Sequence, residues 1–130
     1  MSTDIYFYSY PKNSVSEKVR AEWEKGGWVD HINDVHGEVK NDADELVWFA
    51  RLRTCSESLD LISPKENGHY HGDMEFPITK EIALQFADNI RDVDYKDQTL
   101  PEHVQEDIIK LKQIAEVFDF DNNFLCIHTD

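Results

Sequence analysis

Residues 99–128 read TLPEHVQEDIIKLKQIAEVFDFDNNFLCIH and predict a helix, a turn and a strand in succession. Thr99 and Glu102 have the spacing of a capping box, and Pro101 stands in the first turn. Apolar residues then follow at intervals of 4, 3, 4 and 3, the period of one buried helix face. These are Val104, Ile108, Leu111, Ala115 and Phe118. Residues 119–123 are typical of a turn and residues 124–128 of a strand.

The segment before this helix predicts a strand and another helix. Residues 73–77 alternate apolar and acidic side chains, which is typical of a short strand. Thr79 is a natural N-cap, and apolar residues repeat every four positions after it, so we expect a helix over residues 79–92.

The first half of the chain is less regular. Residues 5–10 are rich in strand-forming aromatics and predict the first strand. Ser14 and Glu17 form a second capping box, which predicts a helix over residues 14–25 that ends at the Gly26-Gly27 pair.

Two further segments of this half have weaker patterns. Residues 28–35 fit one or two short helical turns. Apolar spacings of 4, 3, 4 and 3 predict a helix over residues 42–63, although residues 45–53 taken alone also fit a strand.

Together these elements predict a single domain of the α+β class over residues 1–130. A small antiparallel sheet, made of the N- and C-terminal strands and a short middle strand, packs against about four helices that cover one face. We expect the strand at residues 124–128 to pair with the strand at residues 5–10.

Composition narrows the classes of function. The chain has 27 acidic against 13 basic residues and a formal charge of −14, whereas a protein that grips nucleic acid directly needs a basic face. The first residues do not read as a signal peptide, and no apolar run approaches the ~20 residues of a membrane span. Cys55 and Cys126 read as buried free thiols. We therefore expect a cytoplasmic protein.

One row of side chains has the chemistry of a metal site. His69, His71, Asp73 and Glu75 stand at alternate positions, so in an extended segment they share one side. The run resembles the His-x-His-x-Asp-His motif of the metallo-β-lactamase family, but Met74 stands where that motif has its last histidine. A metal-dependent hydrolase is thus one hypothesis, and an exposed polar loop and strand edge is the other.

Other motifs of catalysis or cofactor binding are missing. His31 and His36 are spaced too far apart to stack on one helical face, and residues 119–123 lack the Gly and terminal Glu of a calcium loop. No nucleophile elbow surrounds Cys55, and Gly26-Gly27 lacks the neighbours of a phosphate loop. We assign no catalytic residue and no cofactor.

Charge is the positive signal. Residues 1–65 carry a net charge of −4 and residues 66–130 a net charge of −10. Such an excess costs stability through self-repulsion, which suggests that a partner makes use of it. The main expected partner-binding residues crowd the junction of the two best helices: Asp88, Asp92, Asp94, Asp97, Glu102, Glu106 and Asp107. The second group is Asp30, Asp34, Asp42 and Asp44.

Aromatic residues lie between these acids. Trp28, Trp48, Tyr70 and Tyr95 are candidate anchors of the contact if they are exposed, since Trp and Tyr often dominate binding energy. The alternative for each is a place in the core.

Two short motifs resemble small proteins of phages and mobile elements: the opening Asp4-Ile5-Tyr6-Phe7-Tyr8 and the helix start Ile78-Thr79-Lys80-Glu81. The resemblance implies anti-CRISPR, anti-restriction and toxin-immunity proteins, which are compact, acidic, non-catalytic blockers of basic nucleases. It carries no functional residue over, because that class has no shared motif.

We therefore expect an acidic inhibitor that binds a basic nuclease or another nucleic-acid-handling protein, by nucleic-acid mimicry among other routes. It would bind neither nucleic acid nor a membrane directly. The alternatives are the metal-dependent hydrolase of His69, His71 and Asp73, and a structural or regulatory subunit with no inhibitory role.

Overall fold

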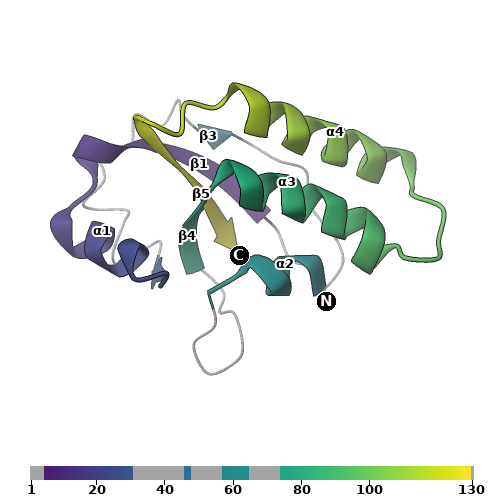
Figure 1. Cartoon of the computed structure of the whole chain (residues 1–130), viewed down its shortest axis with the longest axis horizontal. Helices are drawn as coiled ribbons and strands as arrows, with labels where there is room; N and C mark the ends of the chain where they lie inside the picture. Colours follow the sequence, from purple (N-terminus) through teal and green to yellow (C-terminus); the bar gives the residue numbers. More distant parts are fainter. Residues whose placement is uncertain (1–4, 31–45, 48–56, 65–73, 130) are drawn as a thin grey trace.

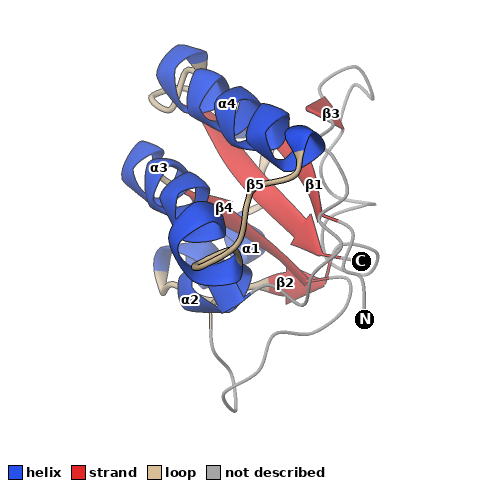
Figure 2. Cartoon of the chain, turned by 90° about the vertical axis from the view of Figure 1, so that its right-hand side faces the viewer, coloured by secondary structure: helices blue, strands red, loops and turns tan. Residues whose placement is uncertain are grey.

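The computed structural model describes residues 5–30, 46–47, 57–64 and 74–129 of the chain. It confirms a small α+β fold with an antiparallel sheet (Figures 1 and 2). The strand order is β2-β4-β5-β1-β3. The strands are β1 (Ile5–Pro11), β2 (Val29–Asp30), β3 (Leu46–Val47), β4 (Met74–Ile78) and β5 (Asn123–Thr129).

The two ends of the described chain form the middle of the sheet, as the sequence predicts. β1 and β5 pair along their whole length, from Ile5 opposite Thr129 to Pro11 opposite Asn123. The other side of β5 pairs with β4, which confirms the short middle strand. β2 and β3, of two residues each, stand at the sheet edges.

The helices lie in two groups. They are α1 (Glu17–Glu24), α2 (Glu57–Ile62), α3 (Lys80–Asn89) and α4 (Glu102–Val117), with a 3-10 turn at Lys12–Ser14 and a π-helical turn at Ile90–Asp94. α3 and α4 pack side by side over the sheet (Figure 2), and α2 packs beside α3. α1 stands apart from them near the end of β1 (Figure 1).

Two hydrophobic cores show that both faces of the sheet are covered. Phe7 of β1 and Ile127 of β5 point toward α2, α3 and α4 in the larger core, together with Phe76 of β4. The opposite face contributes Tyr10 and Cys126 to a smaller core with α1. The expectation of helices on one face only is therefore wrong. Every second residue of β1 is aromatic on the side that α1 covers, so both faces needed a cover.

Of the three predicted helix caps, Ser14, Thr79 and Thr99, one is confirmed. Thr79 caps α3 as predicted, since its hydroxyl accepts a hydrogen bond from the Ile82 amide. At α1 the cap is Ser16, not Ser14, because Ser14 donates its hydroxyl to the Pro11 carbonyl instead.

The start of α4 also departs from the prediction. Thr99 is not the cap, because the helix begins after Pro101, whose carbonyl accepts from the amides of Val104 and Gln105. At this end of the helix, the side-chain Nε2 of Gln105 donates a hydrogen bond to the Leu100 carbonyl at 2.9 Å.

Helix ends follow ordinary backbone chemistry. α1 ends before Gly26, whose φ of 79° lies in the left-handed region that favours glycine. The apolar stripe of α4 is buried as predicted. The third helix runs past the predicted residue 92, since the π-helical turn carries it to Asp94.

Two segments that were predicted as helix form strands instead. Residues 29–30 form β2 rather than a helical turn, and residues 46–47 form β3, in agreement with the strand alternative for that region. Of the long helix predicted over residues 42–63, the structure describes α2 alone. The predictions for residues 31–45 and 48–56 lie outside the described residues.

Candidate functional site

The acidic residues predicted for partner binding take different roles at the junction of α3 and α4. Asp97, Glu102 and Glu106 are exposed. Asp97 lies in the connection between the helices, and the two glutamates lie one turn apart on α4, so their side chains share a face. These three residues are called the acidic end below.

Two neighbouring aspartates are paired with basic residues. Asp88 lies 3.0 Å from Lys112 Nζ and 3.6 Å from Arg91, and Asp92 accepts a hydrogen bond from Arg91 Nε at 2.9 Å. The hydrogen bond and charge of Arg91 hold the pKa of Asp92 below its usual value. This pairing lowers the charge available to a partner at this position.

Asp94 has a structural role. One of its oxygens accepts from the Ser58 amide at 3.1 Å and the other from the Ser58 hydroxyl at 2.6 Å. Because Ser58 stands in the first turn of α2, the carboxylate satisfies a helix amide that has no partner within the helix. Asp94 therefore ties α2 to the end of α3.

Asp107 does not lie on the surface, in contrast to its place in the predicted binding group. The residue is 5% exposed and is one of the buried residues of α4, together with Ile108 and Leu111. Burial raises the pKa of its carboxyl, and its Oδ2 atom has no hydrogen-bond partner among the described residues. Asp107 is unavailable to a partner in this fold.

The outer face of α4 carries a feature that the sequence prediction did not single out. Ile109 is 57% exposed and Val117 is 82% exposed, two and four helical turns beyond Pro101. Both fall outside the buried stripe, so the same periodicity that located the core also identifies them as outward-facing apolar residues. Ile109 follows Glu106 by three positions, which places an apolar side chain next to the acidic end.

The second predicted acidic group is largely outside the described residues. Asp34, Asp42 and Asp44 belong to that part of the chain. The backbone of Asp30 ends β2 opposite Met74 of β4.

Most of the predicted metal row also lies outside the described residues, and its last member, Glu75, is described. His69, His71 and Asp73 lie outside the described residues. Glu75 is fully buried in β4, an interior strand of the sheet, rather than on an exposed strand edge. No group of three or more metal-ligating side chains occurs within the described ranges.

Glu75 instead belongs to a buried polar cluster beneath α1. Its Oε1 atom accepts a hydrogen bond from the Tyr10 hydroxyl at 2.7 Å, and its backbone carbonyl accepts from Trp23 Nε1 at 3.2 Å. His128 is its cross-strand neighbour on β5, and the ring of Tyr8 lies 5.8 Å from the imidazole.

The pKa shifts in this cluster follow from burial. Desolvation, and then the charge of Glu75, raise the pKa of the Tyr10 phenol well above its usual value. Desolvation likewise raises the pKa of the buried Cys126 thiol, which is free as predicted. Both groups are held in their protonated forms, so neither has the lowered pKa of a nucleophile.

Two of the proposed aromatic anchors contribute to the interior. Trp28 and Tyr95 are half-buried and pack against the larger core. Trp48 and Tyr70 lie outside the described residues.

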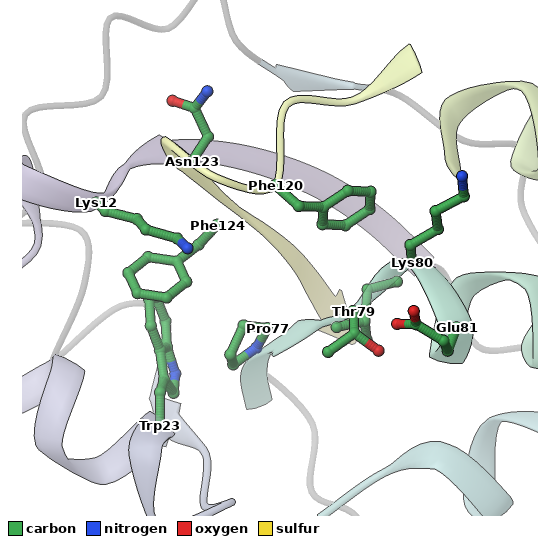
Figure 3. A pocket seen from close by; sticks show the side chains of 10 residues that line it. Lys12, Trp23, Pro77, Thr79, Lys80, Glu81, Phe120, Asn123 and Phe124 are labelled. Carbon is green, nitrogen blue, oxygen red and sulfur yellow. The ribbon is translucent and has the colours of Figure 1, made fainter. Parts of the chain in front are cut away.

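A pocket of about 540 Å³ opens where β4 leads into α3 (Figure 3). Its walls include Trp23 of α1, Pro77 of β4, and Phe120 and Phe124 near the start of β5. Lys12 lines the same pocket, and its ammonium group lies 5.4 Å from the centre of the Phe124 ring. No motif in the sequence indicated this pocket, because its residues come from four separate segments.

Comparisons with known proteins bring no relative to this site. No protein-family model matches the chain, and no curated protein and no solved structure matches it either. Among the described helices, none is both long and apolar enough to cross a membrane.

Proposed function

We propose that this chain is an acidic binding protein that docks onto a basic surface of a nucleic-acid-handling protein and blocks it. The observation that supports the proposal is the acidic end next to exposed Ile109. Exposed acids draw a basic partner by long-range attraction, and an apolar side chain among them adds contact area that is buried on docking.

The roles of the other acids refine the predicted site. Asp88 and Asp92 are paired with bases, Asp94 is bonded to Ser58, and Asp107 is buried. The proposal therefore assigns binding to Asp97, Glu102 and Glu106, and assigns the rest of the predicted first group to folding. Inhibition of a nuclease or of a host-defence complex is the role that we propose for this contact.

The test compares two triple charge reversals. The first is Asp97→Lys, Glu102→Lys and Glu106→Lys. The matched control is Glu17→Lys, Glu24→Lys and Asp121→Lys, which reverses three exposed acids elsewhere. Each set includes one glutamate in the first turn of a helix, so the two sets disturb helix ends and net charge alike.

Partners are captured on the immobilised protein at low salt and eluted by a salt gradient. We expect one basic nuclease or nucleic-acid-binding complex on the wild type, its loss from the first variant, and its retention by the control. Equal losses from both variants would indicate attraction by net charge alone. That result, or the absence of a basic partner, would favour the structural or regulatory reading.

The alternative function, a metal-dependent hydrolase, needs a separate test, since three of its four residues lie outside the described ranges. Metal analysis of protein purified without a histidine tag decides it. A bound divalent ion near full occupancy would favour the enzyme.

A further inference from the structure

The pocket at the start of α3 combines aromatic walls with a cation, in a protein whose net charge is −14. Its volume of about 540 Å³ is that of a small-molecule site. Phe120, Phe124 and Pro77 are half-buried, so each leaves part of its apolar surface open. The walls therefore suit a flat, apolar ring.

Lys12 supplies the charge. Its ammonium group lies over the Phe124 ring and faces the hollow (Figure 3). Within the described part of the chain it forms no ion pair. Its backbone is fixed, because the Lys12 amide donates to the Asn122 carbonyl at 2.9 Å and the Lys12 carbonyl accepts from Arg20. A lysine whose backbone is held in place, and whose ammonium group lies beside aromatic rings without an ion pair among the described residues, favours an anionic ligand group.

The other charged groups near the pocket limit where the anionic group of a ligand can bind. Lys80 is paired with Glu116 of α4 at 3.3 Å and points away from the hollow (Figure 3). Glu81 lies at the other side of the pocket from Lys12 and would repel an anion there. Asp119 is hydrogen-bonded to Asn122 in its own turn, and this bond, with a smaller contribution from the charge of Lys12, lowers the pKa of its carboxyl. The anionic group therefore fits at Lys12 alone.

From these observations we infer that the pocket binds a small planar aromatic anion, with its ring against Phe120 and Phe124 and its carboxylate or phosphate group at Lys12. This ligand site is independent of the acidic end. The pocket lies at the start of α3, and the acidic end follows the π-helical turn Ile90–Asp94 that continues this helix, about 20 Å away along the helix axis.

A titration followed by two-dimensional amide NMR tests the inference, with 2-naphthoate as the probe. We expect saturable shifts of the amide signals of Thr79, Lys80 and Asn123. The neutral isostere 2-naphthamide keeps the ring and removes the charge, so it should bind at least about five-fold more weakly. This comparison needs no variant of the protein.

Two lysine variants test whether Lys12 is the residue that binds the anionic group of the ligand. Lys12→Gln should weaken naphthoate binding about five-fold, whereas Lys96→Gln, at the other end of α3, should leave it within about two-fold. The amide spectrum of each variant also reports whether it is folded. The inference is overturned if naphthoate gives no saturable shift up to about 5 mM. Equal affinity for naphthoate and naphthamide, or an unchanged affinity in Lys12→Gln, would overturn it too.

Discussion

The hydrogen bond between Tyr10 and Glu75 offers a sharp test of the core beneath α1. Tyr10→Phe removes one oxygen atom and keeps the ring stacked on Trp23, at a centroid distance of 6.3 Å. Tyr10 is 1% exposed and Glu75 is fully buried, so water does not readily replace the lost donor. A net hydrogen bond to a charged group contributes about 1.5–3 kcal/mol, and we therefore expect a loss of about 2 kcal/mol.

Urea unfolding followed by circular dichroism measures this loss, and thermal unfolding should show a fall in Tm of about 6–10 °C. Tyr6→Phe is the matched control: it removes a hydroxyl from a half-buried ring on the same face of β1 and should change stability by less than about 0.5 kcal/mol. Glu75→Gln keeps an oxygen that can accept the Tyr10 hydrogen bond but removes the charge, so the loss caused by Tyr10→Phe should be smaller in that background by about 1 kcal/mol.

The same pair predicts a dependence on alkaline pH. The pKa of Tyr10 is raised in the folded protein, whereas an unfolded phenol titrates near about 10. Above that pH the unfolded chain releases a proton that the folded chain keeps, so the free energy of unfolding falls as pH rises. The Tyr10→Phe protein lacks this dependence, and its deficit should narrow above pH ~10. A variant as stable as the wild type at neutral pH would refute the reasoning.

Three further changes probe other contacts. Asp94→Ala should cost about 1–2 kcal/mol in urea unfolding, because the first turn of α2 loses both bonds to Ser58; a wild-type midpoint would argue against the cap. Asp107→Asn should remove a pH dependence, because burial raises the pKa of the Asp107 carboxyl: relative to the variant, the wild type should become more stable as pH falls from 7 toward about 4, and an unchanged difference would argue against that burial. In a Cys55→Ser background, Cys126 should react with a thiol reagent only as fast as the chain opens; rapid labelling of the folded protein would contradict its burial.

The sequence predicts most of the larger core, because that core is built from local periodicity. The buried stripe of α4, the cap at Thr79 and the pairing of residues 5–10 with residues 124–128 are all confirmed. The smaller core was missed, since nothing in the sequence of α1 says which face it covers. The rings of Tyr6, Tyr8 and Tyr10 at every second position were the available signal.

The candidate site is less predictable than the fold. The pairing of Asp88 with Arg91 is readable from their spacing of three, but the contact of Asp94 with Ser58 joins residues 36 positions apart. Glu75 was predicted to be part of an exposed polar row because His69, His71 and Asp73 stand at the alternate positions before it. Its burial depends on Tyr10, Trp23 and His128, which only the folded sheet brings together.

The pairing of β1 with β5 also sets the order in which the molecule can be made. β1 leaves the ribosome more than about 100 residues before its partner β5, and closing that loop costs about 4 kcal/mol of chain entropy. α3 and α4 are neighbours in sequence and can pair early, whereas β1 and β4 have, among the described strands, just the two-residue strands β3 and β2 as partners until β5 is made. During synthesis, β1 therefore lacks its full-length partner strand until β5 emerges. A chain cut short before β5 loses the central strand, not an edge.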